Sequence, residues 1–254
     1  MISTISMKGI GAVTMAVAAL AAGCGDGGDE DAAAATGGLP QGSEHVELDP
    51  AQFTTTIDNR YWPMTPGSRW VYQEVEDGKS QRVVVTVTDR TKTVGGVEGR
   101  VVRDVVSDEA TGESIEVIDD YYAQDADGNI WYLGEDTTEY KNGKPQSTAG
   151  SFHAGVDGAE AGVALPAEPV QGLTYRQEYY AGEAEDEGEV LRTGEQAESA
   201  FGHFNDVLVT RDINPLEPKV VEYKFYAPNV GPLLTLDVSG ASGREELLRY
   251  TPGA

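Results

Sequence analysis

The chain has 254 residues, with 43 acidic and 18 basic side chains and a formal net charge of −25. This charge argues against nucleic acid as a partner and against electrostatic attachment to anionic lipid, because both need clustered Lys and Arg. Roughly 200 residues remain after the N-terminal segments described next, which is enough for one substantial hydrophobic core.

The first segment, "MISTISMKGIGAVTMAVAALAAGC", has the layout of a signal peptide, which we place at residues 1–23. A single cation, Lys8, precedes an apolar run from Gly9 to Ala22. That run is too short for a comfortable membrane span and ends in small residues, as secretory signals do. The sequence therefore predicts export from the cytoplasm.

The end of this segment, Ala21-Ala22-Gly23-Cys24, resembles a bacterial lipobox, with Ala21 where Leu is usual. The resemblance implies cleavage before Cys24, diacylglycerol on its sulfur, and a further acyl chain such as palmitate on the new amino terminus. Two or three acyl chains suffice for stable anchoring, here on the outer side of a bacterial cell membrane. The alternative is an ordinary secretory signal with an incidental cysteine.

Residues 24–50 are rich in Gly, Ala and Asp and contain no aromatic residue. Such a segment buries too little apolar surface to offset the entropy lost on ordering. We predict a flexible acidic tether here, followed by a single β-rich domain over residues 51–254.

From position 53 onward, short runs of period two are separated by Gly, Pro, Asn or Asp. The runs are 69–75, 81–90, 99–108, 113–125, 129–140, 173–193, 206–213, 220–228, 231–238 and 245–252. Long stretches of helical periodicity are lacking, so helices should be few and short. The pattern predicts an all-β antiparallel domain of about ten strands, and a barrel, a half-barrel or a sandwich would each fit it.

The stretch "YYAQDADGNIWYLGE" places Asp125, Asp127 and Asn129 two apart, as calcium ligands often are. In an EF-hand loop the glycine stands at position six, whereas Gly128 would stand at position four. We therefore expect a β-hairpin turn, with a cation site at Asp125 and Asp127 as the weaker alternative. The acidic run that includes Glu185 and Asp186 should be a solvated loop, with weak Ca²⁺ binding as its alternative. No other cofactor is expected.

Two predicted strands each present acid, base and tyrosine on one face. In one, Arg176, Glu178 and Tyr180 alternate with other residues, and in the other Glu222, Lys224 and Tyr226 do so. If both faces point into a barrel, these side chains could line a pocket for a small ligand. If they point outward, they form surface ion pairs of little consequence.

The stretch "DNRYWPMTPGSRWVY", residues 58–72, resembles the front motif Asn-x-Tyr-[Trp/Phe]-Pro-x-x-Pro-Gly-x-x-Trp-x-Tyr of a family of predicted bacterial lipoproteins and secreted proteins, many of them actinobacterial. Segments as far as Tyr250 are similar to that family as well, with Phe152-His153 where relatives tend to have Trp-Glu. The resemblance implies no particular activity. Two prolines and a glycine favour sharp turns, so we expect Tyr61, Trp62 and Trp70 to close one end of the domain.

Catalytic motifs such as His-Glu-x-x-His and Gly-x-Ser-x-Gly are absent from the sequence. The leading hypothesis is thus a lipid-anchored, non-catalytic surface protein that binds a small or lipidic ligand or a protein partner. The alternatives are a structural envelope protein whose acidic surface holds divalent cations and a hydrolase that uses two carboxylates.

Overall fold

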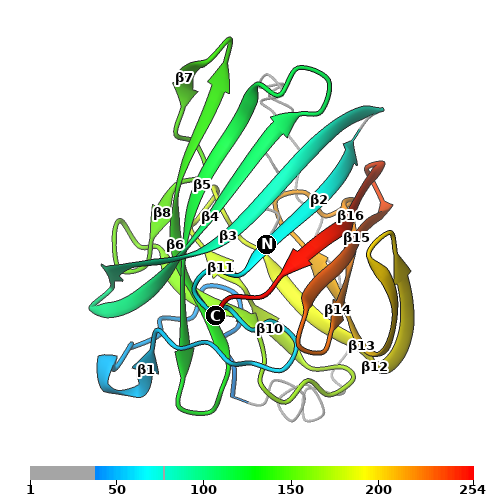
Figure 1. Ribbon diagram of the computed structural model, residues 1–254. Helices are drawn as coiled ribbons and strands as arrows, with labels where there is room; N and C mark the ends of the chain where they lie inside the picture. Colours follow the sequence, from blue (N-terminus) through cyan, green and yellow to red (C-terminus); the bar gives the residue numbers. More distant parts are fainter. Residues whose placement is uncertain (1–37, 77) are drawn as a thin grey trace, which may run out of the picture.

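The computed structural model describes residues 38–254 except residue 77 (Figure 1). The expected signal peptide, Cys24 and the first part of the expected tether lie outside these residues. Among the described residues, no helix has the length and apolar character needed to cross a membrane.

One short 3-10 helix, η1 (Pro50–Gln52), precedes the strands. The strands are β1 (Phe53–Thr54), β2 (Arg69–Glu76), β3 (Lys79–Val94), β4 (Val97–Asp108), β5 (Ser114–Asp125), β6 (Ile130–Lys141), β7 (Lys144–Ser147), β8 (Phe152–His153), β9 (Glu160–Leu165), β10 (Thr174–Arg176), β11 (Glu178–Tyr179), β12 (Glu187–Ser199), β13 (Gly202–Ile213), β14 (Val221–Ala227), β15 (Gly231–Ser239) and β16 (Gly243–Thr251). The predicted all-β class is confirmed, and the strands exceed ten because short pieces such as β7, β8 and β11 are added to the long runs.

The strands form a nearly closed antiparallel barrel (Figure 1). Their order is β10-β12-β13-β14-β15-β16-β2-β3-β4-β5-β6-β9-β11, so most strands pair with their neighbours in the chain. The last strand, β16, pairs with β2 and joins the two ends of the meander. Of the three architectures that the sequence allowed, the structure therefore has the barrel, which leaves few unpaired edges.

The chain between β10 and β11 closes the seam of this barrel. Thr174 to Arg176 pair with β12, and Glu178 and Tyr179 pair with β9. At the crossing, the Gln177 amide donates to the Asp186 carbonyl over 2.7 Å. The backbone approaches β9 so closely that a Cβ on Gly162 would lie 2.3 Å from the Gln177 carbonyl oxygen. Only glycine fits there, since that separation is far below van der Waals contact.

Residues 39–49, which we call the N-terminal strap, lie against the outside of the barrel. The Arg176 amide donates to the Pro40 carbonyl over 2.7 Å, and the Gln41 side chain donates to the Thr174 carbonyl over 2.8 Å. Leu39 and Leu48 pack against the core. The sequence suggested that the flexible tether extends to residue 50. In the structure this last part of it is held in place, because contacts with the distant seam provide the apolar and polar partners that the strap itself lacks.

The front motif lies across one end of the barrel. The Asn59 amide group donates to the carbonyls of Gly128 and Pro166, and the Arg60 carbonyl accepts from Asn229. These partners belong to three different loops at that end, so the segment ties them together. Trp62 is almost wholly buried beneath them. We call residues 57–67 the plug.

Candidate functional site

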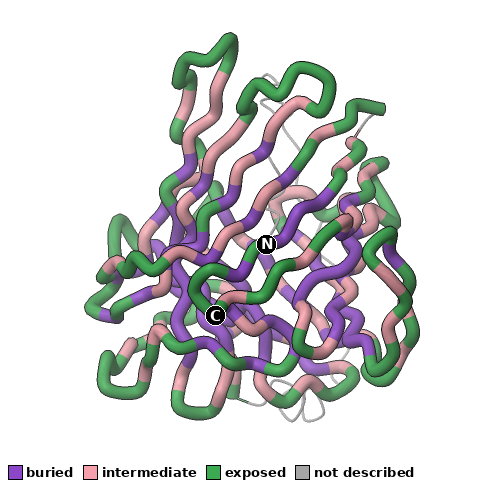
Figure 2. The backbone as a smooth tube through the Cα atoms, in the orientation of Figure 1, coloured by how far each residue is buried: buried purple, intermediate pink, exposed green. Residues whose placement is uncertain are grey.

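The inward-facing side chains change character along the barrel. Near the plug they are aromatic and apolar, and Trp62 packs against Tyr122 and Tyr226 with ring centroids 5.4 and 6.1 Å away. Towards the opposite strand ends, inward positions carry carboxyl groups. Figure 2 shows buried residues concentrated in one half of the barrel and more exposed residues along the far strand ends. We call the part of the barrel interior that holds the buried carboxyl groups of Asp104, Asp120, Glu135, Glu178, Asp186, Asp212, Glu222 and Glu245 the acidic end.

Eight carboxyl side chains are buried among the described residues: Asp104, Asp120, Glu135, Glu178, Asp186, Asp212, Glu222 and Glu245. The buried basic side chains are Lys224 and Arg176. Ladder register places most of these acids on the same face as Trp70 and Tyr72, because residues directly opposite in an antiparallel pair share a face. The fold thus brings together inside the barrel acidic side chains that lie on strands distant in the sequence.

Lys224 on β14 neutralises one side of the acidic end. Its Nζ lies 2.7 Å from Asp212 Oδ2 and 3.6 Å from Glu222 Oε2. Asp212 also accepts from the Gln177 side chain at 3.0 Å and from the Thr210 hydroxyl at 2.9 Å. Burial alone would lower the pKa of Lys224, but the attraction of Asp212 and Glu222 outweighs it and raises that pKa. Lys224 is therefore a fixed positive charge among several acids.

A second group joins β5 and β6. The Tyr132 hydroxyl lies 2.9 Å from Asp120 Oδ1 and 2.6 Å from Glu135 Oε2. A hydroxyl has one hydrogen, so one of the two carboxyl groups must itself donate to it. Burial, together with the charge of Glu135, raises the pKa of Asp120 to about 8. Asp120 and Glu135 thus share a proton at neutral pH.

Glu178 and Asp186 form a third group at the seam. The two carboxyl groups interact with each other, and the Asn214 side chain also favours the ionised form of Asp186. Burial, and then the charge of Asp186, raises the pKa of Glu178 well above its ordinary value, while burial raises that of Asp186 to about 6. Glu178 therefore keeps its proton and can donate it to Asp186, which makes the two a proton-sharing pair.

Asp104 on β4 has no such partner. It is 0% exposed, and neither of its carboxyl oxygens accepts a hydrogen bond within the described part of the chain. It pairs with Val85, which in turn pairs with Trp70, so it faces inward. Burial, followed by the charges of Asp120 and Glu245, raises the pKa of Asp104 well above its usual range. Buried carboxyl groups normally have hydrogen-bond partners, so Asp104 marks a place where a partner is missing.

The three predicted ligand-binding residues on β14 share the inward face. Glu222, Lys224 and Tyr226 are all buried and alternate with partly exposed residues. Glu222 and Lys224 lie opposite Asp212 and Thr210 on β13, which explains the contacts above. Of the two orientations that the sequence left open for this strand, inward or outward, the structure has the inward one.

The other three predicted residues do not share a face. Arg176 points away from the acidic end, and its guanidinium donates to the carbonyls of Gly42, Glu44 and Ala161 at 2.6 to 2.8 Å. Glu178 lies within the acidic end instead. Tyr180 is half-buried at an isolated bridge to Ala184. Alternation fails here because the chain leaves β12 and joins β9 between residues 176 and 178.

The predicted hairpin at residues 125–130 is confirmed, since β5 ends at Asp125 and β6 begins at Ile130. Asp125 Oδ1 accepts from the amides of Asp127 and Asn129, and Oδ2 accepts from the Asn129 and Trp131 side chains. Both oxygens of Asp125 thus stabilise the turn itself, and Asp127 is exposed.

The other two candidate metal ligands, Glu185 and Asp186, lie in different environments. Glu185 accepts from the Gly182 amide in a surface turn, whereas Asp186 pairs with Glu178 inside. Within residues 38–254, residue 77 aside, no three or more His, Cys, Asp or Glu side chains are grouped as metal ligands would be.

Asp104 and Glu245 were not singled out from the sequence. Asp104 does carry a weak signal, because it occupies an inward position in an otherwise apolar alternation. In "VVRDVV" the inward series is Val102, Asp104 and Val106. An acid in such a place indicates either an outward face or a special interior, and only strand register distinguishes the two.

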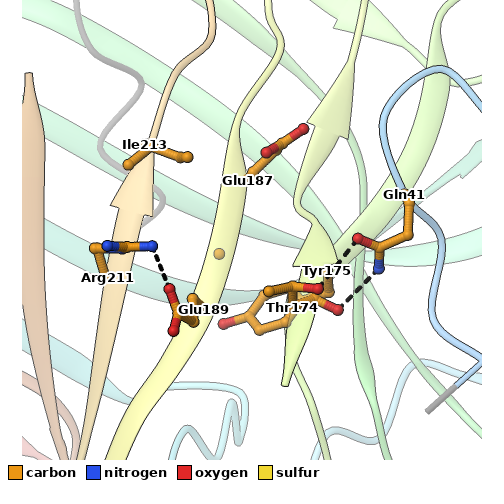
Figure 3. Close-up of a pocket in the computed structure, with 8 residues that line it drawn as sticks. Gln41, Thr174, Tyr175, Glu187, Glu189, Arg211 and Ile213 are labelled. Carbon is orange, nitrogen blue, oxygen red and sulfur yellow. Dashed lines mark hydrogen bonds and ion pairs between the residues drawn. The ribbon is translucent and has the colours of Figure 1, made fainter. Parts of the chain in front are cut away.

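Two small hollows lie outside the acidic end. One, of about 50 Å³, lies beside the strap (Figure 3) and is lined by Gln41, Thr174, Tyr175, Glu187, Gly188, Glu189, Arg211 and Ile213. In it, Arg211 forms an ion pair with Glu189. The other, of about 150 Å³, is bordered by His153 and Tyr180. His153 Nε2 lies 2.9 Å from Asp136, so it is tied to a surface ion pair.

No protein-family model matches the sequence, and a search of curated proteins found no match. One similar solved structure is the crystal structure of a predicted lipoprotein from Parabacteroides distasonis. The alignment has a TM-score of 0.41 and 13% identity, and it covers 76% of this chain and 99% of that one. A likeness at this level supports no inference about function.

Proposed function

We propose that the protein is a lipid-anchored, non-catalytic binding protein on the outer side of a bacterial membrane, which takes a small polar ligand into the acidic end of its barrel. The observation that carries this proposal is the shared inward face of Glu222, Lys224 and Tyr226, which meets Gln177 and Asp212 opposite the plug. Convergent polar groups above an aromatic floor are typical of ligand pockets. Such a lining favours a polar ligand over a lipid tail.

The anchor rests on the sequence around Cys24 and on the family that the front motif resembles. A Cys24→Ser variant, which cannot accept diacylglycerol, should move from the membrane fraction to the soluble exported fraction. Incorporation of labelled palmitate should be lost with it. Unchanged fractionation of the variant would refute the anchor, whereas binding by the barrel would be unaffected.

Ligand binding in the barrel can be tested by filling it. Thr235 on β15 is buried and faces Lys224 and Glu245 on the neighbouring strands. A thermal-shift panel of amines, sugars, carboxylates and fatty acids should reveal a stabilising compound. A Thr235→Trp variant should remain folded and lose that effect.

The matched control lies on the same strand but outside the barrel. Val238 is 46% exposed, so Val238→Trp should leave the response unchanged. If Thr235→Trp fails to fold while Val238→Trp folds, the interior is packed solid and the binding proposal is wrong. Stabilisation by Ca²⁺ alone would instead favour a structural protein that holds divalent cations.

A second candidate is a hydrolase, which the Glu178–Asp186 pair favours. One carboxyl that stays protonated beside one whose pKa is raised to about 6 is the arrangement used for general acid–base chemistry. This candidate requires turnover of glycoside or similar substrates that Glu178→Gln abolishes. Because both side chains are almost wholly buried, binding without turnover remains the better-supported function.

A further inference from the structure

We propose that the ligand of the acidic end is an organic cation with two or more ammonium groups, held between Asp104, Asp120 and Glu245. This inference rests on the proposed binding function and specifies the chemistry of its ligand. It follows from a charge imbalance, from an unpartnered carboxyl group, and from the spacing of the acids around the wall.

The charge imbalance is confined to one side of the acidic end. Lys224 contacts Asp212 and Glu222, and therefore offsets the acids on β13 and β14. Arg176, the other buried base of the described residues, donates instead to strap and β9 carbonyls. Asp104 on β4 and Asp120 on β5 thus have no buried base beside them in the described part of the protein, and Lys224 acts on Glu245 of β16 only across the intervening β15. A cation placed there would stabilise their ionised forms, which burial otherwise disfavours.

Asp104 indicates where such a cation would bind. Its carboxyl is fully buried, faces inward and accepts no hydrogen bond from the described residues. Asp120 and Glu245 lie near enough for their charges to act on it. Without a cation, burial and mutual repulsion keep protons on these three carboxyl groups, and a positively charged group that joined them would replace those protons. An ammonium group can donate three hydrogen bonds, so it can serve more than one of them.

The spacing of the acids favours an extended cation over a metal ion. Glu245 on β16 and Asp104 on β4 are separated by β2 and β3 in the barrel wall. Neighbouring strands are about 4.8 Å apart, whereas a Ca²⁺ ion binds its oxygens at about 2.3–2.6 Å. Tyr72 faces inward from β2, a strand that lies between those of Glu245 and Asp104. An aliphatic chain over the Tyr72 ring, with ammonium groups at both ends, matches this arrangement.

The probes are the diamine putrescine and the triamine spermidine, and calorimetry at about 0.15 M salt suppresses weak surface attraction. Butanediol, which has the putrescine chain without charge, and Ca²⁺ are the comparison ligands. Both amines should bind the purified protein and raise its Tm, whereas butanediol and Ca²⁺ should not. Asp104→Asn should weaken amine binding at least tenfold.

Glu113→Gln is the matched control, since it removes one exposed acid from the turn between β4 and β5 and should leave affinity unchanged. Asp104→Asn should fold at least as well as the parent, because an amide is cheaper to bury than a carboxylate. Equal amine affinity in the parent and both variants would mean non-specific surface attraction and would overturn the inference.

The remaining outcomes separate this inference from the function on which it rests. If butanediol, a sugar or a fatty acid binds in a way that Thr235→Trp abolishes, while the amines do not bind, the ligand is not a cation but the barrel still binds ligands. If Ca²⁺ binds and Asp104→Asn abolishes it, the site holds a metal ion and the inference is wrong. If no compound binds, both proposals fail.

Discussion

Inside the barrel, Nζ of Lys224 lies 2.7 Å from Oδ2 of Asp212, and the two side chains are only 2% and 6% exposed. Replacing Lys224 by Met would leave Asp212 and Glu222 buried without their cation. Removing one partner of a buried ion pair costs about 3–5 kcal/mol. We therefore expect the free energy of unfolding, measured by urea denaturation, to fall by that amount.

The neighbouring exposed Lys219 provides the control, and Lys219→Met should have little effect. A Lys224→Met, Asp212→Asn double variant should regain part of the lost stability, since the amide no longer requires a positive partner. If Lys224→Met costs no more than Lys219→Met, the pair lies in water, and the described burial is incorrect.

Stability should decrease as pH rises through neutrality. Burial raises the pKa of Asp186 to about 6, those of Glu116 and Glu222 to about 7, and those of Asp120 and Glu245 to about 8. Between about pH 4 and pH 8 the folded state therefore binds more protons than the unfolded state. The free energy of unfolding then falls with increasing pH, at about 1.4 kcal/mol for each unit of pKa difference.

Thermal unfolding at pH 5 and pH 8 measures this effect, and we expect the protein to be more stable at pH 5 by at least about 3 kcal/mol. A variant that combines Asp120→Asn with Glu245→Gln should show a weaker dependence of stability on pH. Exposed Glu113→Gln should leave it unchanged. A stability that rises from pH 5 to pH 8 would show that these acids are ionised and solvated in the folded protein.

The attachment of the strap to the barrel should depend on Arg176. An Arg176→Met variant leaves the carbonyls of Gly42, Glu44 and Ala161 without their donor. Leaving buried acceptors unsatisfied costs about 1–3 kcal/mol each, and here the strap can detach to reach water. We expect faster hydrogen exchange over residues 40–46 by mass spectrometry, together with a lower Tm.

Exchange in the central strands, such as β3 and β4, should change little, because the Arg176 guanidinium bonds to Gly42, Glu44 and Ala161 and not to these strands. Arg192→Met is the control, since that side chain is 68% exposed. Strap exchange that is equally fast in the parent and in Arg176→Met would mean that the strap is not held by this guanidinium.

The seam should not tolerate a side chain at Gly162. An added Cβ would lie 2.3 Å from the Gln177 carbonyl oxygen, so Gly162→Ala must push β11 away from β9. Overpacking of this kind costs about 1–3 kcal/mol, and more where backbone must move. Urea denaturation should show a loss at the upper end of that range.

For comparison, Gly143→Ala adds a methyl group to open space in the β6–β7 turn, where only the positive φ of 67° opposes it. That cost should be about 1–2 kcal/mol. A Gly162→Ala variant as stable as Gly143→Ala would argue that the seam is loosely paired.

How far the sequence predicted the site depends on the strand. For Glu222, Lys224 and Tyr226 the alternation correctly indicated one shared face, because β14 is regular over these residues. For Arg176 and Glu178 it was misleading, because the strand changes partner at Gln177. Local periodicity contains no information about such a change.

Asp104 shows the same limit of local periodicity in a regular strand. The stretch "VVRDVV" alternates with period two, but this alternation does not indicate which face of the strand lies inside the barrel. The pairing of β4 with β3 decides this, since Val85 and Trp70 lie in register with Asp104. The strap is a further example, because its partners at Thr174 and Arg176 are more than a hundred residues away in the chain.

By itself, the sequence determined the strands, their turns and the all-β class, because two-residue alternation and turn residues are local properties of the backbone. It also determined the excess of acid. Only the tertiary structure decided that the acids converge inside the barrel, that Lys224 offsets one side of them and that Arg176 fastens the strap. These are consequences of register and closure, which bring together residues from strands that are distant in the chain.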